Sequence, residues 1–321
     1  MKLTVVAVSL IGACLYASSP LAAETAPTMV TLSTGSEVAA WTLPPDKEAH
    51  KTPIIFVHGG PGMYTTEGAK TKGAPFRAAG FTTIYYDQAG GGKSKKIAAP
   101  NYTIERAVAD LEALRVALKL DKLVLWGSSY GASLATLYAT RNPSHVAGII
   151  LTSPGSFPGT HAKHDYKSTN RDKVKIGKEL SRMAGKIDRQ GAAAEASVSQ
   201  EEAGRAFDAL VNADLLGGMV CKGSALTSPS PGTGGNLFAN RMLSKDLDKI
   251  SFKPVWTMKV PALIVRGSCD FLPESNAGAF ATLFGTKLTA IPNTGHGLIE
   301  NPDALDAVFA AFARGPLASV E

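Results

Sequence analysis

Short, uninterrupted apolar segments recur along this chain of 321 residues and limit its possible folds more than any other feature. Each lacks the polar alternation of a half-exposed strand, which is typical of strands buried on both faces of a parallel sheet. The stretches between them suit helices, most clearly at 104–118, where apolar residues recur at helical spacing after Thr103, a candidate N-cap. The segments lie at 54–57, 82–86, 123–126, 146–151, 262–265 and 288–291. Strand alternating with helix predicts an α/β fold with a mostly parallel sheet covered by helices.

The order of these patterns also suggests how the chain is organised. Two extended segments at 29–33 and 37–43 flank Gly35 and predict an antiparallel hairpin at the start of the sheet. The strand pattern then breaks at 155–258, where a basic piece, an alanine-rich piece and a Ser/Pro/Gly loop follow one another. We therefore expect a helical cap at 155–258, inserted between a first part of the core at 24–154 and a second part at 259–321.

The amino-terminal segment 1–23 has the pattern of an export signal. Lys2 gives a positive start, 3–16 is mostly apolar, and small residues precede a cleavage point near Ala22 or Ala23. The apolar run is too short for an ordinary membrane span, so no stable span is expected. The mature protein is predicted to be extracytoplasmic, either periplasmic or secreted.

The three cysteines leave two questions open. A lipoprotein signal ending at Cys14 is the alternative to ordinary cleavage, and it would anchor the protein through a lipid on Cys14. If Cys14 leaves with the signal, only Cys221 and Cys269 remain. An oxidising compartment permits those two to pair, and two free thiols are the alternative.

Charge and ligand spacing exclude several classes of function. The formal net charge is +6, and no run of five or more like charges is present, so nucleic acid is not an expected partner. No pair of His, Cys or carboxylate residues has metal-ligand spacing, so we propose neither a metal nor a cofactor. The segment 90–94 ends like a phosphate-binding loop, but that motif needs a glycine five positions before Gly92, where the chain has Asp87.

The strongest chemical signal is a Gly-x-Ser-x-Gly turn at 127–131, between a predicted strand and a predicted helix. Such a turn raises the hydroxyl of its serine, here Ser129, to the carboxyl edge of the sheet. Glycine is needed at Gly127 and Gly131 because a side chain there would strike neighbouring backbone. Ser129 is therefore the candidate nucleophile.

Serine is a weak nucleophile and needs a base to take its proton, with a carboxylate to orient that base. In folds with this turn, the acid and then the histidine follow the serine in the chain. Asp270 follows the strand at 262–265, and His296 follows the strand at 288–291, so both belong to loops at the same edge. We predict Asp270 as the acid and His296 as the base.

A glycine-rich loop follows the strand at 54–57 and supplies a candidate oxyanion hole. The loop reads His58-Gly59-Gly60-Pro61-Gly62. Its glycines allow backbone amides to point inward, so we assign the amides of Gly60 and Tyr130 to this role. His58 is expected to brace the loop rather than to transfer protons.

Taken together, these motifs resemble those of the proline iminopeptidases and their relatives among the α/β hydrolases. The matching segments are 58–62, 87–94, 127–131 and 295–296, and in the second of them Ala89 replaces an arginine that the family carries. The resemblance covers about 54–153 and 260–312. It implies the α/β-hydrolase fold and a helical lid above Ser129.

The resemblance also implies a small-molecule or short-peptide substrate, most directly the release of an amino-terminal residue. In the true peptidases, acids of the cap hold the free amino terminus of the substrate. This cap lacks the motifs expected for that role. Glu201 and Glu202 are candidates for holding the amino terminus, and the alternative is that they belong to a solvent-exposed helix face. An esterase or lactonase with the same triad, and a non-catalytic binding protein, are the other hypotheses; the oligomeric state is not predicted.

Overall fold

The structure is a computed structural model that describes residues 26–50, 52–160, 166–170, 176–212, 217–226, 232–252 and 259–320. The expected signal peptide at 1–23, with Cys14, lies outside these residues.

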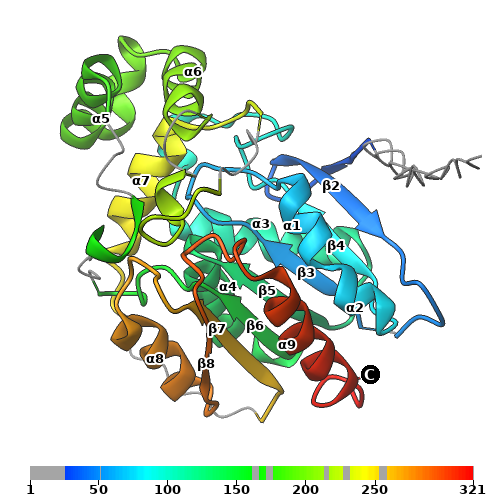
Figure 1. Cartoon of the computed structure of the whole chain (residues 1–321). Coiled ribbons are helices and arrows are strands. Elements are labelled where there is room, and N and C mark those ends of the chain that lie inside the picture. Colours follow the sequence, from blue (N-terminus) through cyan, green and yellow to red (C-terminus); the bar gives the residue numbers. More distant parts are fainter. Residues whose placement is uncertain are drawn as a thin grey trace, which may run out of the picture.

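An eight-stranded sheet forms the centre of the fold, in the order β1-β2-β4-β3-β5-β6-β7-β8 (Figure 1). The strands are β1 Thr28–Thr31, β2 Glu37–Leu43, β3 Ile54–Val57, β4 Thr83–Tyr86, β5 Leu123–Ser128, β6 Val146–Thr152, β7 Ala262–Gly267 and β8 Leu288–Ile291. Strand β2 runs antiparallel to β1 and β4, and the other neighbours are parallel. The predicted mostly parallel α/β sheet is confirmed.

The entry hairpin is also confirmed. β1 and β2 pair in register from Thr28 opposite Ala40 to Thr31 opposite Glu37. The amide of Gly35 donates to the carbonyl oxygen of Leu32 at 2.8 Å, and Gly35 adopts a φ of 86°. A residue with a side chain would be strained in this conformation, which explains a glycine at the turn. Because the turn begins earlier than expected, β1 ends at Thr31 and not at residue 33.

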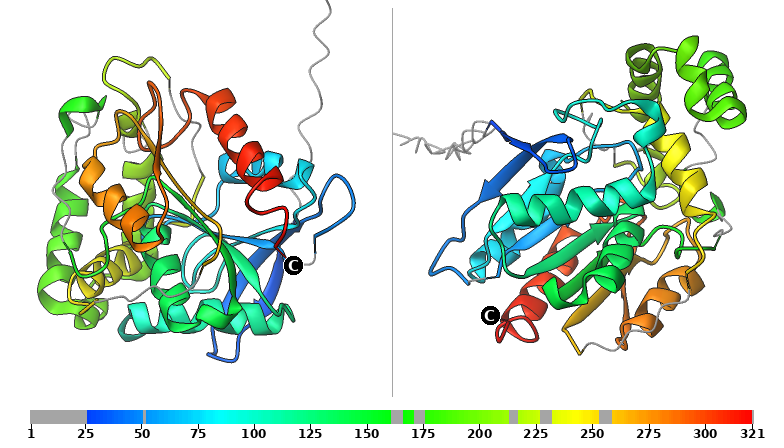
Figure 2. Two further views of the ribbon diagram at one scale, coloured as in Figure 1. Left: turned by 90° about the horizontal axis from the view of Figure 1, so that it is seen from below. Right: turned by 180° about the vertical axis from the view of Figure 1, so that it is seen from behind.

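Two layers of helices bury both faces of the sheet (Figure 2). The helices are α1 Glu67–Lys72, α2 Ala74–Ala78, α3 Ile104–Ala117, α4 Tyr130–Arg141, α5 Lys178–Gln190, α6 Gln200–Leu210, α7 Leu237–Leu247, α8 Glu274–Leu283 and α9 Pro302–Arg314. Ile55 and Val57 of β3 share a core cluster with α3, α4 and α8, whereas Ile54 and Phe56 share another with α2 and α9. All four residues of β3 are therefore buried, as an uninterrupted apolar strand requires.

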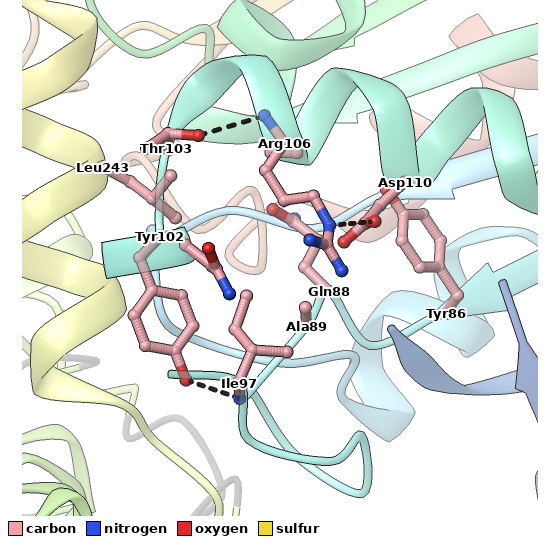
Figure 3. Close-up of a pocket in the computed structure, with 11 residues that line it drawn as sticks. Tyr86, Gln88, Ala89, Ile97, Tyr102, Thr103, Arg106, Asp110 and Leu243 are labelled. Carbon is pink, nitrogen blue, oxygen red and sulfur yellow. Dashed lines mark hydrogen bonds and ion pairs between the residues drawn. The ribbon is translucent and has the colours of Figure 1, made fainter. Parts of the chain in front are cut away.

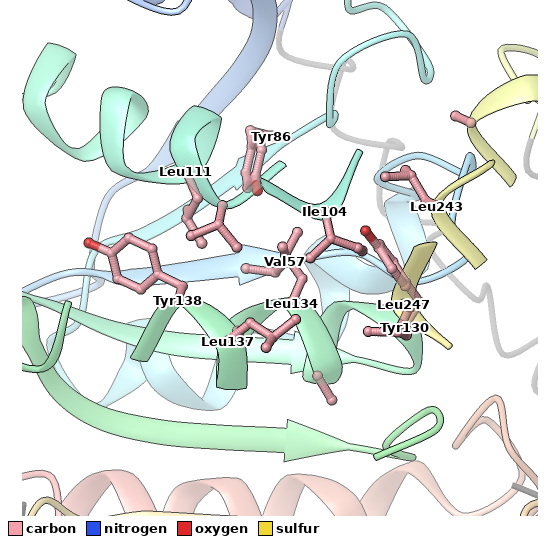
Figure 4. Packing of buried hydrophobic residues seen from close by; sticks show 14 of the residues in the cluster. Val57, Tyr86, Ile104, Leu111, Tyr130, Leu134, Leu137, Tyr138, Leu243 and Leu247 are labelled. Atoms are coloured by element: carbon pink, nitrogen blue, oxygen red, sulfur yellow. The ribbon is translucent and has the colours of Figure 1, made fainter. Parts of the chain in front are cut away.

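Helices α5, α6 and α7 all lie in the chain between β6 and β7. Leu243 and Leu247 of α7 belong to the same apolar cluster as Ile104 of α3 and Tyr130 of α4 (Figure 4). Burying these side chains together attaches the inserted helices to the core through the hydrophobic effect.

A disulfide links Cys221 to Cys269, with the two Cα atoms 5.3 Å apart. The pairing that the sequence left open is therefore present. Cys221 belongs to the insertion, and Cys269 lies in the loop after β7, so the bond ties the insertion to the loop that carries Asp270.

Throughout the described ranges, no helix combines the length and the apolar character needed to cross a membrane.

Candidate active site

Ser129 lies in a sharp turn between β5 and α4, with φ 52° and ψ −124°. Such angles are rare for a residue with a side chain and store local strain. A Cβ added at Gly131 would lie 1.9 Å from the carbonyl oxygen of Val57, and one at Gly127 would lie 2.5 Å from that of Gly131. Both distances are impossible, so the predicted need for the two glycines is confirmed. The turn leaves the Ser129 side chain exposed to a cavity.

The loops after β7 and β8 bring the other two predicted side chains to Ser129. His296 Nε2 lies 3.0 Å from Ser129 Oγ, and His296 Nδ1 lies 2.8 Å from Asp270 Oδ1. Asp270 and His296 are each 6% exposed. With Asp270 ionised, Nδ1 carries the proton and donates a hydrogen bond to the carboxylate. The lone pair of Nε2 therefore faces the serine hydroxyl.

The surroundings of Asp270 keep it charged. Burial alone would raise the pKa of its carboxyl, but His296, the Leu272 amide and Arg266 outweigh that effect and hold the pKa below its usual value. The Leu272 amide donates to Asp270 Oδ1 at 3.0 Å. The carboxylate therefore remains an acceptor for the imidazole throughout the neutral range.

Glu300 orients the histidine loop, although no pattern in the sequence marks it for this role. Glu300 accepts hydrogen bonds from the amide of Gly295 at 2.8 Å and from that of Cys221 at 2.6 Å. One carboxylate thus joins the residue before His296 to the disulfide-linked segment of the insertion. The ring of Phe271 also packs on the imidazole, with centroids 4.5 Å apart.

The glycine-rich loop lies against the nucleophile. A Cβ added at Gly59 would lie 2.9 Å from the Cβ of Ser129, so no side chain fits at position 59. Gly60 and Tyr130 line the same cavity as Ser129. Within the described part of the chain, neither of their amides donates a hydrogen bond. Both remain available to a ligand, and their assignment as the oxyanion hole stays a prediction.

His58 links two loops and stays neutral. Its Nδ1 lies 2.8 Å from the Gly59 carbonyl oxygen, and its Nε2 accepts from the Gln88 amide at 2.9 Å. Burial lowers the pKa of His58 to about 4, although the bond to Gly59 opposes the effect. An uncharged ring with both nitrogens engaged holds the glycine loop in place, which agrees with the expected bracing role.

We expect replacement of His58 by Gln to remove part of the acid sensitivity of the fold. In the unfolded chain His58 is protonated below about pH 6.5, whereas in the folded protein it stays neutral down to about pH 4. Between these two pH values protonation of His58 favours the unfolded state, so the free energy of unfolding falls as the pH is lowered. The free energy of unfolding of the wild type, relative to the variant, should fall by about 3 kcal/mol across this pH range.

Urea unfolding of both proteins at pH 7, 5.5 and 4 measures this difference. The comparison is necessary because Asp87, whose pKa burial raises to about 6, acts in the opposite direction in both proteins. A difference that does not change with pH would contradict the neutral, buried state of His58.

The second glycine-rich segment, 87–94, packs against the side chain of its own Asp87. The amides of Thr65 and Lys93 donate to the two carboxylate oxygens of Asp87 at 2.7 and 2.8 Å. A Cβ at Gly92 would lie 2.1 Å from Asp87 Oδ2, so this glycine is required by packing. The backbone of this segment is thus held around the Asp87 carboxylate.

A small cavity lies beside Ala89, where the family carries arginine (Figure 3). It has a volume of about 20 Å³, which holds one water and no substrate. Arg106 of α3 also lines it and pairs with Asp110 at 2.8 Å.

A much larger cavity of about 780 Å³ opens above Ser129 and His296. Apolar side chains form most of its walls. From the sheet and from α1 and α9 come Phe56, Ala69, Trp126, Leu305 and Phe309; from α5, α6 and α7 come Leu180, Ala184, Phe207, Leu210 and Leu247. A cavity of this size and character is suited to a small organic substrate.

The charged groups on this wall differ from those expected. Glu201 and Glu202 are exposed and lie outside the cavity lining, so the solvated helix face is the correct alternative for them. The wall instead carries Asp188, which accepts two hydrogen bonds from Arg241 at 2.8 and 2.6 Å. It also carries Lys72, which the sequence did not single out.

Among the residues that the structure describes, no group of three or more His, Cys, Asp or Glu side chains is arranged to hold a metal ion.

Comparison with known proteins agrees with the resemblance found in the sequence. A family model described as the alpha/beta hydrolase fold matches residues 52–302. A proline iminopeptidase of Heyndrickxia coagulans is 37% identical over 114 residues, which are 34% of this chain and 37% of that protein. One from Neisseria meningitidis serogroup A is 35% identical over 100 residues, or 31% of each chain. The chain therefore matches only about a third of the length of these relatives.

Solved structures resemble the chain over most of its length. An esterase from Exiguobacterium antarcticum has a TM-score of 0.63 at 17% identity, covering 90% of this chain and 100% of its own. A proline iminopeptidase-related protein from Thermus thermophilus has a TM-score of 0.57 at 19% identity, covering 92% and 98%. At such identities the likeness is one of fold.

Proposed function

The chain belongs to the α/β-hydrolase fold family, and on that premise we propose that it is a serine hydrolase with Ser129 as nucleophile, His296 as base and Asp270 as the orienting acid. The observation that carries the proposal is the continuous series of contacts from Asp270 through His296 to Ser129, at 2.8 and 3.0 Å, beneath an open cavity. This arrangement has the geometry that serine activation requires.

The proposed reaction proceeds through an acyl-enzyme. His296 Nε2 takes the proton of Ser129 as Oγ attacks the substrate carbonyl carbon, and Asp270 stabilises the imidazolium that forms. The amides of Gly60 and Tyr130 stabilise the oxyanion, and each such donor contributes roughly two to three orders of magnitude in rate. His296 then protonates the leaving group, and water, activated by the same imidazole, hydrolyses the ester on Ser129.

We propose an aminopeptidase of the proline iminopeptidase type, which releases an amino-terminal residue from short peptides. The identity of 37% to a proline iminopeptidase supports this choice, as does the presence of its motifs around Ser129 and Gly60. Because only about a third of that protein is matched, the substrate remains part of the proposal.

Carboxylic ester or lactone hydrolysis is the second candidate, and one observation favours it. Two acids line the cap side of the cavity, Asp188 and Asp248. Asp188 is already neutralised by Arg241 and accepts from Lys245 through its backbone carbonyl oxygen, and Asp248 also has a partner. An aminopeptidase needs a carboxylate that can accept the amino terminus of its substrate, whereas an ester does not.

A panel of three substrates separates the two candidates. We expect a proline arylamide to be cleaved, with kcat/KM above that of an alanine arylamide, and a short-chain aryl ester to be cleaved as well, since esters are more reactive. Initial rates of arylamine and phenol release measure this. Turnover of the ester with neither amide cleaved would contradict the peptidase assignment and leave the serine hydrolase in place.

We also propose that the protein is exported, through the signal at 1–23, to a periplasmic or extracellular location. The disulfide between Cys221 and Cys269 supports this because such bonds persist in oxidising compartments. Mass spectrometry of the mature amino terminus tests it. A terminus near Ala22 or Ala23 is expected, and a lipidated Cys14 at the terminus would indicate the anchored alternative.

A further inference from the structure

Lys72 is a cation on the wall of the large cavity, and the proposed mechanism does not use it. It is the last residue of α1 and is partly buried. Its Nζ donates to the carbonyl oxygen of Gly297 at 2.6 Å, so it lies beside the residue that follows His296. An ammonium group has two further protons to donate.

No carboxylate balances this charge within the described part of the chain, where the Gly297 oxygen is the partner of the Lys72 ammonium. Lys70, two positions earlier in α1, is different because it pairs with Glu67 at 2.6 Å. Burial lowers the pKa of Lys72 to about 8, with no opposing effect from an anion. A cation removed from water without a counter-ion is costly, so its site favours a ligand that supplies one.

The surroundings of Lys72 are suited to part of a substrate. Ala69 and Lys72 of α1 line the cavity together with the apolar Trp126, Leu298 and Phe309. A charged group placed among apolar side chains fixes the orientation of a ligand and contributes to specificity. His296 must also deliver its proton to the leaving group, so the leaving group lies on the imidazole side of Ser129, the side on which Lys72 meets the histidine loop.

We propose that Lys72 binds a carboxylate on the leaving group of the substrate, so that the preferred substrates are short peptides with a free carboxyl terminus. The inference rests on the proposed hydrolase function and specifies its substrate further. The ammonium of Lys72 would form a charge-assisted hydrogen bond with the carboxylate while it keeps its bond to Gly297.

The test compares two peptides that differ only at the carboxyl terminus: a dipeptide with a free acid and the same dipeptide as its amide, followed by the matching tripeptides. We expect the wild type to show a kcat/KM about 10- to 100-fold higher for the acid, the usual value of a hydrogen bond between charged groups. Lys72→Met should bring the ratio of acid to amide close to 1, and Lys72→Arg should restore part of it.

Lys70→Met is the matched control, because it removes the same charge from the same helix at a residue that is paired with Glu67 and lies outside the cavity lining. It should keep the wild-type ratio. Thermal unfolding of each variant checks the fold. If Lys72→Met lowered kcat/KM for acid and amide by the same factor, Lys72 would only fasten α1 to the histidine loop, and the proposal would be overturned.

A second pair of substrates distinguishes where the carboxylate lies. An aryl ester of a monocarboxylic acid is compared with the aryl hemiester of a dicarboxylic acid of equal length, which carries its carboxylate on the acyl side. A preference that depends on Lys72 for the hemiester, and not for the peptide acid, would overturn the leaving-group assignment. Failure of the wild type to hydrolyse any of these substrates would instead refute the proposed function, before any variant is compared.

Discussion

Ser129→Ala is expected to lower kcat for the best substrate of the panel by about 10⁵-fold, with the thermal unfolding midpoint close to that of the wild type. The hydroxyl oxygen of Ser129 is the atom that attacks the substrate carbonyl. The methyl group of alanine cannot attack, and a water molecule bound in its place cannot form an acyl-enzyme. The substitution removes only one oxygen from a side chain that faces the cavity, so the strained turn at 127–131 keeps its backbone. Catalysis from the two amides alone is all that remains.

Covalent labelling makes the same test independent of the natural substrate. An organophosphorus reagent directed at serine nucleophiles should add its mass once per chain, on the peptide that contains Ser129, and should not label Ser129→Ala. Ser181→Ala is the matched control, because Ser181 is exposed on α5 and lies outside the cavity lining. A Ser129→Ala enzyme within tenfold of wild-type activity would place the nucleophile elsewhere.

The parts of the site that follow from local rules could be predicted from the sequence. The turn around Ser129 is specified by two glycines whose side-chain positions are filled by backbone. Asp270 and His296 can be placed beside Ser129 from the sequence because each follows a short apolar strand, and the loops after parallel strands lie at one edge of the sheet. The chain order of the three residues completed the assignment.

The contacts that escaped prediction join residues far apart in the chain. Lys72 is hydrogen-bonded to Gly297, 225 positions away in the sequence, and Glu300 is hydrogen-bonded to Cys221, 79 positions away. Neither lysine nor glutamate has a local pattern that marks such a role, because the partner is a backbone group supplied by the packing of another element. Glu201 and Glu202 illustrate the opposite case: the sequence showed that acids were present in the insertion, but only the packing of α6 shows that they face away from the cavity.

Asp270→Asn is expected to lower kcat by about four orders of magnitude while KM changes little, by analogy with other triads. Asp270 contacts His296 and the Leu272 amide and does not line the cavity, so substrate binding does not depend on it. His296 Nδ1 and the Leu272 amide both bond to Oδ1, so asparagine keeps the two donors if its oxygen takes that place and loses both if its amide group, itself a donor, takes it.

If that amide faces Nδ1, the imidazole places its proton on Nε2 instead, where it points at Ser129 and cannot accept the serine proton. The neutral side chain also fails to stabilise the imidazolium formed during attack. Steady-state kinetics across the panel measure both parameters, and Asp121→Asn, at an exposed position before β5, is the matched control. Because surrounding groups hold the pKa of the Asp270 carboxyl below its usual value, the wild-type side chain is charged at neutral pH, where the two enzymes are compared. Normal turnover by Asp270→Asn would mean that another group orients His296.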